Sequence, residues 1–290
     1  MNKIKILIPI YNDWKSVFKL LENINIEISS LDIDLSVMII NDASTEDMPE
    51  LSRSLENLKS IQVINMRDNR GHARCNAAGL KYINKKEDFD YIIPMDGDGE
   101  DRPEELSLLI EKIKDYPDTV VTANRVKRSE GFLFKFCYIA HKYLTLIFTG
   151  KSIKYGNYSC LPKSAVNKMV TEPATWSSFS GSLAKIVKDR KSIPSERGIR
   201  YFGPSKMSFI SLLKHSLSII AVFKVTLLIR SILFLIAYLF LVMGRVSIIT
   251  LTPVIGVIVM MTSVVALSKR ENISEFNSSL DNIKEITKLK

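Results

Sequence analysis

The chain has 290 residues, of which 46% are apolar, and a formal net charge of +9 at pH 7. This length suits one large domain with an appendage, and the positive charge favours phosphorylated substrates, an anionic membrane surface or nucleic acid as partners. The sequence has no zinc-finger, homeodomain or RNP-type motif, which argues against nucleic acid, and its three scattered cysteines indicate neither a disulfide framework nor a zinc site.

Short apolar runs alternate with amphipathic segments in the first part of the chain. The runs predict buried strands at 4–10, 35–40, 61–65, 91–95 and 119–123. Helical periodicity predicts helices at 14–28, 75–82 and 103–115, and a further helix is expected after Ser44 or Thr45, either of which is a suitable N-cap. Such alternation predicts an α/β domain with a doubly wound, mostly parallel sheet.

The segment MDGDGEDRPEEL at 95–106 is the most informative part of the chain. Asp96 and Asp98 directly follow a predicted buried strand, where an open α/β sheet binds its ligands. Clustered carboxylates repel one another unless a cation lies among them, and oxygen ligands suit Mg²⁺ or Mn²⁺ held partly by a diphosphate. A solvated acidic loop is the alternative, with Asp101 capping the helix that begins at Pro103. That alternative does not account for Asp96 and Asp98, so we favour the metal-diphosphate site.

The C-terminal part of the chain is strongly apolar. Segments 225–243 and 246–267 are each near the length of about 20 residues that spans a bilayer, and the short link between them predicts a transmembrane hairpin rather than a buried core hairpin. Arg230 near the start of the first span is expected to snorkel to the interface. Segment 207–224 fits an interfacial helix and a surface helix of the globular domain equally well.

Charge and the N-terminal sequence predict the orientation of the chain. Lys269, Arg270 and later lysines favour a cytoplasmic tail at 268–290. No signal-peptide core precedes the first strand, so the catalytic part is expected to face the cytoplasm. The predicted organisation is a catalytic domain at 1–206, the helix at 207–224, two spans within 225–267 and the tail.

Polar residues follow four of the predicted strands. They form the groups Tyr11-Asn12-Asp13, Asp42-Ala43-Ser44, Asn69-Arg70-Gly71 and Asp96-Gly97-Asp98. Because parallel strands end at one edge of the sheet, these groups converge on one crevice. A nucleobase edge needs a hydrogen-bond acceptor such as Asp42, and a diphosphate needs a metal.

With these motifs the chain resembles the family 2 glycosyltransferases, which have the nucleotide-diphospho-sugar GT-A fold. The resemblance rests on IPIYND, IINDASTED, RDNRGHARCNAAG and MDGDGEDRPEEL in this order, and it covers about residues 3–206. Within the family, the segment RYFGPSKMS and the apolar hairpin resemble the polyprenyl-phosphate glycosyltransferases, such as dolichol-phosphate mannose synthases and bactoprenol glucosyltransferases.

The resemblance implies roles for individual residues. Donor binding falls to Pro9, Tyr11, Asn12, Asp13, Asp42, Ser44, Asn69, Gly71, Arg74 and Asp96. Mg²⁺ or Mn²⁺ binding falls to Asp96, Asp98 and Glu100, and acceptor-phosphate binding to Arg125, Arg128, Arg200, Ser205 and Lys206. The residues implied to be catalytic are Asp96, Asp98, Arg200 and Lys206. Two positions depart from the family pattern: Asp13 is one methylene shorter than the usual residue, and Ala43 replaces a turn glycine.

The acceptor is expected to be a phosphate. A sugar hydroxyl acceptor needs a general base, whereas a lipid phosphate is already ionised. Residues 173–188, where related enzymes often carry the base, contain no carboxylate. His72 and His141 are expected to be structural.

The sequence therefore predicts an inverting glycosyltransferase of the inner membrane, with two spans, that moves a sugar from a nucleotide-diphospho-sugar to polyprenyl phosphate in cell-envelope biogenesis. Transfer to a hydroxyl of a lipid-linked glycan or cell-surface polysaccharide is the enzymatic alternative. A catalytically silent nucleotide-sugar-binding scaffold is the alternative from another class. The sugar, the nucleotide base and whether the chain forms a homo-oligomer stay open.

Overall fold

The computed structural model describes residues 1–51, 53–127, 132–204 and 209–290. Its contacts divide the chain into two compact units. The first consists of Met1–Ser129, Lys154–Lys206 and Asn272–Lys290, and the second of Glu130–Ile153 and Met207–Glu271. Each unit is thus built from segments that are far apart in the sequence.

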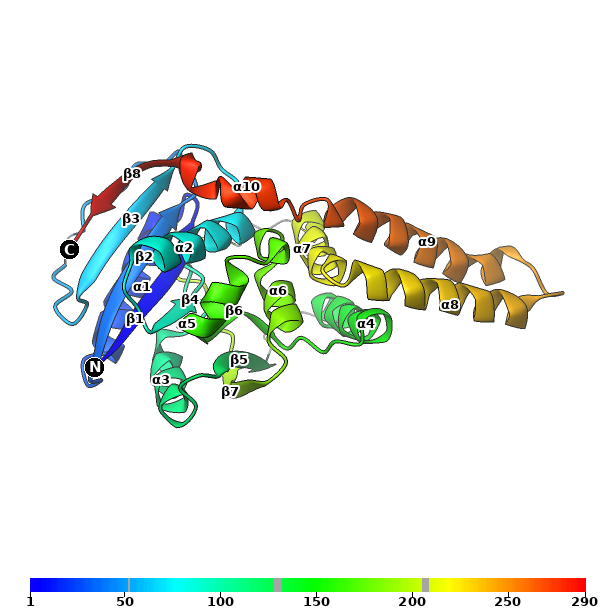
Figure 1. Ribbon diagram of the computed structural model, residues 1–290, viewed down its shortest axis with the longest axis horizontal. Helices are drawn as coiled ribbons and strands as arrows, with labels where there is room; N and C mark the ends of the chain where they lie inside the picture. Colours follow the sequence, from blue (N-terminus) through cyan, green and yellow to red (C-terminus); the bar gives the residue numbers. More distant parts are fainter. Residues whose placement is uncertain (52, 128–131, 205–208) are drawn as a thin grey trace. The chain divides into compact units, whose positions relative to one another are not determined.

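Within the described residues, the first unit contains an eight-stranded sheet in the order β7-β5-β6-β4-β1-β2-β3-β8 (Figure 1). The strands are β1 (Asn2–Ile10), β2 (Ile33–Asn41), β3 (Ser60–Met66), β4 (Tyr91–Pro94), β5 (Val120–Lys127), β6 (Tyr155–Pro162), β7 (Arg190–Glu196) and β8 (Ile283–Lys288). Neighbours among β4, β1, β2 and β3 are parallel, as are β5 and β7, whereas β6 and β8 run antiparallel to their neighbours. These pairings confirm the predicted α/β fold, and they bring the polar ends of β1 to β4 to one edge.

Helices pack on both faces of the sheet. They are α1 (Trp14–Glu27), α2 (His72–Lys86), α3 (Leu106–Asp115), α5 (Lys163–Met169), α6 (Phe179–Ile186) and α10 (Ile273–Asn277). Ile4, Ile6 and Ile8 of β1 are fully buried in one cluster with residues of α1 and α3. Leu7 faces the other side, where a Cβ at Gly79 of α2 would lie 2.4 Å from a Leu7 methyl carbon. Because both faces of β1 are covered, the strand is a continuous apolar run in the sequence.

The last residues of the chain return to the sheet. β8 pairs with β3, with Ile286 opposite Ile64, and Figure 1 shows it at the sheet edge beyond β3. Phe276 of α10 is fully buried, and its ring stacks on that of Trp176 with centroids 5.5 Å apart. Residues 272–290, expected to belong to a separate tail, are therefore part of the first unit, because β8 pairs with the edge of β3 and Phe276 enters a core.

The helix expected after Ser44 or Thr45 does not form. Between β2 and β3, the described residues contain no helix. The Ser44 hydroxyl accepts a hydrogen bond from the Asn12 N–H at 2.8 Å, and the Asn12 side-chain oxygen accepts from the N–H groups of Thr45 and Glu46 at 2.8 and 3.2 Å. These contacts with the end of β1 use the groups that a helix cap would need.

The second unit contains four described helices: α4 (Phe132–Thr149), α7 (Phe209–Ala221), α8 (Lys224–Val242) and α9 (Ile248–Ser268). The helix α4, expected within the catalytic domain, thus belongs to this unit. The helices that begin at Lys224 and Ile248 have mean hydropathies of 2.5 and 2.3, and only 11% of each apolar window is buried. By length and composition both are compatible with crossing a membrane, and their exposure distinguishes them from core helices of soluble domains.

Arg230 of α8 binds the end of α4. Its guanidinium donates a hydrogen bond to the carbonyl oxygen of Ile147 at 2.8 Å. A cation is favourable there because the carbonyl groups at a helix C-terminus carry partial negative charge. Arg230 therefore caps the C-terminus of α4. The sequence predicted only that this side chain would snorkel to the membrane interface.

Candidate functional site

The acidic run after β4 folds into a turn that its own carboxylates hold. Asp101 Oδ2 accepts a hydrogen bond from the Asp96 N–H, and Asp98 Oδ1 accepts one from the Glu100 N–H, both at 3.0 Å. Asp101 is only 4% exposed and does not cap the following helix as expected, because its carboxylate turns back to the end of β4. Arg102 occupies the N-cap position, without a side-chain capping bond.

Two arginines from the segment after β7 form ion pairs with carboxylates of this turn. Arg200 Nη1 lies 2.7 Å from Asp98 Oδ2, and its other terminal nitrogen pairs with Asp13 at the end of β1. Arg197 pairs with Glu100. Arg200, Asp98 and Asp13, all singled out in the sequence, therefore meet in one half-buried cluster.

The segment that carries these arginines lies against the turn through its backbone as well. The N–H groups of Gly198 and Tyr201 donate to the carbonyl oxygens of Glu100 and Asp98, each at 2.9 Å. The Tyr201 ring covers Gly99, where a Cβ would lie 2.5 Å from a ring carbon. Gly99 also has a φ of +90°, so both conformation and space require glycine there.

Burial and mutual repulsion separate the pKa values of these carboxyl groups. Burial, reinforced by the charge of Asp96, raises the pKa of Asp98 to about 6 and outweighs the ion pair with Arg200. Burial and Asp96 likewise raise the pKa of Asp101 to about 7. Burial opposes ionisation of Asp96 too, but the charge of His72 lowers its pKa overall. The turn therefore carries more negative charge than its partners balance, an arrangement that favours a cation.

His72 and Asn157 contact Asp96, and sequence reasoning assigned neither to the site. His72 Nε2 lies 3.3 Å from Asp96 Oδ1, and the Asn157 amide nitrogen lies 3.2 Å from the same oxygen and 2.7 Å from His72 Nε2. His72 was expected to be structural, yet it begins α2 directly after Gly71 of a predicted strand-end group. This position next to a predicted strand-end group could have identified His72 as a site residue from the sequence. Asn157 lies on β6, which is antiparallel to its neighbours, and no motif in the sequence marks it.

The end of β1 presents Tyr11 and Asn12 to solvent and to β2. Tyr11 is 43% exposed, while Pro9 is buried within the strand. Ala43 has a φ of 56°, so it keeps the left-handed conformation for which the family uses glycine. This conformation strains an L-residue by about 1–2 kcal/mol.

Asp42 fixes the loop that follows β3. It is 3% exposed, and its two carboxylate oxygens accept hydrogen bonds from the N–H groups of Arg70 and Gly71, both at 2.8 Å. Asn69 in the same loop is exposed. The structure thus brings Asp42 and Gly71 together, as expected. The Asp42 carboxylate, which the sequence suggested as an acceptor for a nucleobase, accepts its hydrogen bonds from the backbone of this loop.

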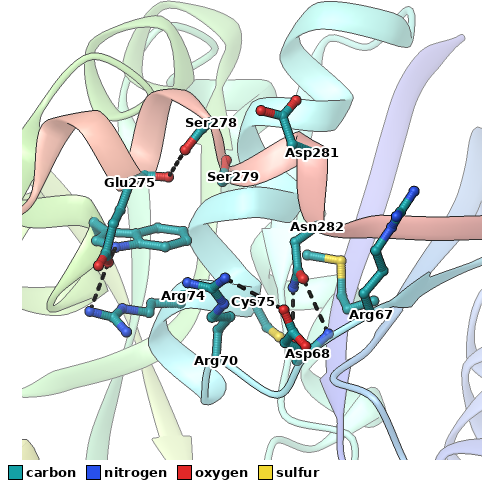
Figure 2. Close-up of a pocket in the computed structure, with 12 residues that line it drawn as sticks. Arg67, Asp68, Arg70, Arg74, Cys75, Glu275, Ser278, Ser279, Asp281 and Asn282 are labelled. Carbon is teal, nitrogen blue, oxygen red and sulfur yellow. Dashed lines mark hydrogen bonds and ion pairs between the residues drawn. The ribbon is translucent and has the colours of Figure 1, made fainter.

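Arg74 lies apart from the acidic turn, although it was expected to bind the donor. Its guanidinium lies 3.1 Å from Glu275 of α10 and 5.3 Å from the centroid of the Trp176 ring (Figure 2). Arg74 follows His72 by two residues, which is a rotation of about 200° around the helix, so the two side chains leave α2 on different sides.

Among the basic residues expected to bind phosphate, the structure describes Arg125 and Arg200. Arg125 Nη2 lies 3.5 Å from the buried Asp101 carboxylate, so its guanidinium acts as a counter-ion within the turn. Arg128, Ser205 and Lys206 lie outside the described residues.

No group of three His, Cys, Asp or Glu side chains among the described residues forms a ready metal cage. Glu100 pairs with Arg197 and Asp98 pairs with Arg200, so metal binding by Asp96, Asp98 and Glu100 stays a prediction. A site with so few protein ligands suits a metal that a diphosphate helps to hold.

The sequence model described as glycosyl transferase family 2 matches residues 5–171, more than half of the chain. The chain belongs to this family. As a family 2 glycosyltransferase it has the GT-A fold, and the matched segment includes β1 to β4, the acidic turn, His72 and Asn157.

Solved structures confirm the fold of this glycosyltransferase. A mannosyltransferase from Pyrobaculum calidifontis in complex with GDP-Man and Mn²⁺ is 14% identical, with a TM-score of 0.51 over 97% of this chain and 86% of that chain. Glucosyl-3-phosphoglycerate synthase from Mycobacterium tuberculosis in complex with Mn²⁺ and UDP is 14% identical, with a TM-score of 0.53 over 79% and 80%. Mannosyl-3-phosphoglycerate synthase from Rubrobacter xylanophilus is 12% identical, with a TM-score of 0.56 over 76% and 72%.

Proposed function

We propose that this glycosyltransferase is anchored in the membrane and moves a sugar from a nucleotide-diphospho-sugar to polyprenyl phosphate, with inversion at the anomeric carbon. The observation that carries the proposal is the presence, in one chain, of a family 2 catalytic unit and two exposed apolar helices of spanning length. A lipid-anchored acceptor explains why both are needed.

The acidic turn supports a donor bound through Mg²⁺ or Mn²⁺. Asp96 and Asp98 offer oxygen ligands of the kind that a divalent cation prefers, and burial together with the charge of Asp96 raises the pKa of Asp98. Two of the similar structures hold Mn²⁺ with a nucleotide. When bound, the metal would supply stabilisation of the charge that grows on the leaving diphosphate. Arg200 would move from Asp98 toward the phosphates as the donor enters.

The chain path supports a transmembrane hairpin. Residues before α8 and residues after α9 both contribute to the first unit, whose sheet includes β8. A hairpin of two spans returns the chain to the side from which it left. The proposed location is the inner membrane with the catalytic unit in the cytoplasm, as the basic residues after α9 favour.

The lack of a base near α6 supports an ionised acceptor. Residues 173–188 contain no carboxylate, and Glu172 just before them accepts hydrogen bonds from the Ala174 N–H at 3.2 Å and from Lys185 at 2.7 Å. A phosphate oxygen attacks without losing a proton, so the protein must orient it and offset its charge. Arg128, Ser205 and Lys206 are the proposed acceptor contacts, together with Arg200.

The test is to incubate membranes that contain the protein with a panel of labelled nucleotide sugars and polyprenyl phosphate. Label is expected in the lipid fraction for at least one sugar, and Asp98→Asn membranes are the matched control. Label on a hydroxyl-bearing glycan, with none on polyprenyl phosphate, would replace the proposal with the polysaccharide or glycan acceptor. That second candidate is favoured by the phosphoglycerate synthases among the similar structures, whose names indicate acceptors other than a lipid. The absence of transfer from every donor would support the scaffold alternative.

A further inference from the structure

The helix α4 carries an apolar stripe that the second unit leaves uncovered. The stripe consists of Ile139, Tyr143, Leu146 and Ile147, whose side chains are between 43% and 58% exposed. At about 3.6 residues per turn, these four positions lie within about 100° around the helix. A continuous apolar surface of this kind marks a contact with a partner of low polarity.

The opposite side of α4 packs against the other helices of the unit. Phe148 is buried in one cluster with Ile220 of α7, Leu227 of α8 and Val257 of α9. The centroid of its ring lies 6.3 Å from that of Phe234 of α8, and Figure 1 shows α4 beside the first turns of α8. The stripe is therefore not the surface through which α4 joins these helices.

The path of the chain excludes α4 as a further membrane span. The strand before it, β5, and the strand after it, β6, pair with each other in the sheet, with Thr122 opposite Ser159. A single crossing would place the two strands on opposite sides of a bilayer, so α4 must leave the sheet and return on one side. Its 18 residues also include Lys135, His141 and Lys142. This pattern suits a helix that lies on a membrane rather than across it.

Charge indicates a lipid surface as the partner. The sequence of α4 contains basic residues and neither aspartate nor glutamate, which favours contact with anionic headgroups. In the same unit, α8 exposes Ile229 and Leu233, so apolar surface continues from the stripe to a helix of spanning length. A lipid bilayer covers both surfaces at once.

Arg230 sets the depth of α4. It follows Lys224, the first residue of α8, by six residues, which is about 9 Å along the helix axis. The charged Lys224 is the earliest point at which α8 enters hydrocarbon, so the end of α4 that Arg230 binds lies at most about 9 Å below that level. Interfacial helices bury their apolar face by about 5–10 Å, and the two depths agree.

We propose that α4 lies in the membrane interface, with the apolar stripe among the acyl chains and Arg230 bound to the carbonyl groups at its C-terminus. Backbone carbonyl groups in lipid need a partner within the protein, and Arg230 supplies it. In the chain, α4 connects β5 and β6, which carry Arg125 and Asn157 of the acidic site. The inference rests on the membrane anchoring proposed above and adds a third attachment to the two spans.

The test uses the full-length protein in liposomes of phosphatidylcholine and phosphatidylglycerol, in which part of the phosphatidylcholine carries bromine near the headgroup end of its acyl chains. Ile147→Trp places an indole on the stripe, and Leu233→Trp places one on α8 to report the anchor. Ile26→Trp is the matched control, because Ile26 is 63% exposed but lies on α1 of the first unit. The wild type, whose Trp14 and Trp176 are each 3% exposed, gives the background fluorescence.

Bromine should quench about half or more of the fluorescence that Ile147→Trp adds, because an interfacial side chain lies about 5–10 Å deep. Bromine near the methyl end of the acyl chain should quench it less. Leu233→Trp should show the reverse order, since Leu233 lies about 14 Å along α8 from Lys224. Ile26→Trp should be quenched no more than the wild type. Tyr143→Trp is a second variant of the stripe, with the same expected quenching as Ile147→Trp.

The proposal is overturned if Leu233→Trp is quenched but Ile147→Trp and Tyr143→Trp are not, and the spans then stand without it. Blue-shifted emission of the unquenched variants would show that protein, such as a second copy of the chain, covers the stripe instead of lipid. Quenching of Ile26→Trp equal to that of Ile147→Trp would also overturn it, because the effect would not depend on position. If Leu233→Trp is not quenched either, the proposed anchor and this inference fail together.

Discussion

Asn282 connects the C-terminal segment to the loop between β3 and α2. Its side-chain oxygen accepts a hydrogen bond from the Asp68 N–H at 3.1 Å, and its amide nitrogen donates to the Asp68 carbonyl oxygen at 2.9 Å. Asp42 holds the other end of the same loop through the N–H groups of Arg70 and Gly71. We therefore predict that Asn282→Ala loosens a loop on which donor binding depends.

The structure sets the size of the effect. Two hydrogen bonds are lost, each with a net value of about 0.5–1.5 kcal/mol. Asp68 is exposed, so water replaces part of this interaction, and a net loss of about 1–2 kcal/mol is expected. Since about 1.4 kcal/mol corresponds to a factor of ten, the KM for the nucleotide sugar should rise about 5- to 30-fold.

The assay compares KM for the donor and kcat in the full-length protein, after the donor panel has identified the sugar. Asn277→Ala is the matched control, because Asn277 lies in the same C-terminal segment but its side chain accepts a hydrogen bond from Lys81 of α2 at 3.0 Å. Asn282→Ala should raise KM with kcat nearly unchanged, and Asn277→Ala should leave both unchanged. A KM for Asn282→Ala within twofold of the wild type would refute the reasoning, as would equal effects of the two variants.

Four further predictions concern the acidic turn, the strained turn at Ala43 and the two apolar helices α8 and α9. Asp98→Asn should reduce sugar transfer by orders of magnitude while circular dichroism shows a retained fold, and EDTA should reduce wild-type transfer similarly; full activity in EDTA would rule out the metal. In metal-free protein, the raised folded pKa of Asp98 means that its contribution to the free energy of unfolding is fully present below about pH 4 and is lost as the pH rises to about 6. The wild type should therefore lose up to about 3 kcal/mol relative to Asp98→Asn over this range in denaturant titrations, and parallel pH profiles would contradict the assigned burial. Ala43→Gly should raise the free energy of unfolding by about 0.5–1 kcal/mol, since relief of the left-handed strain exceeds the added entropy of the unfolded chain; a lower midpoint would count against it. Carbonate washing should leave the full-length protein in the membrane pellet, and its release would show that α8 and α9 do not span.

The structure also changes one expectation about Arg200. The resemblance implies that Arg200 binds the acceptor phosphate, which predicts that Arg200→Ala weakens acceptor use. Because the guanidinium bridges Asp98 and Asp13, its loss should perturb donor binding as well. Separate measurement of donor and acceptor affinity in this variant distinguishes the two roles.

Local sequence determined most of the α/β unit. Each of the first four strands is a short apolar run because both faces of a parallel sheet are covered, and the structure contains strands at all four places. The convergence of Asp13, Asp42 and Asp96 on one edge of the sheet also followed from the sequence, since the carboxyl ends of parallel strands share an edge. The apolar hairpin was evident from length and composition alone.

Local rules failed where a distant group competed for the same hydrogen-bonding atoms. Thr45 offered a good helix cap, but Asn12 of the preceding strand takes its amide. Asp101 stood before a helix start, yet burial against Arg125 and the Asp96 amide outweighs capping. In both cases the partner is defined only once strands have been brought together.

The sequence by itself therefore determined the order of strands and helices along the chain, the acidic turn and the two apolar helices of spanning length, because apolar periodicity and the position of charges are local properties. Only the tertiary structure decided which charges pair, that Arg74 pairs with Glu275, and that the chain returns after α9 to add β8 to the sheet. The six residues of β8 are mostly exposed and lack a strong pattern. Their structure comes from the free hydrogen-bonding edge of β3, which no local stretch of sequence reveals.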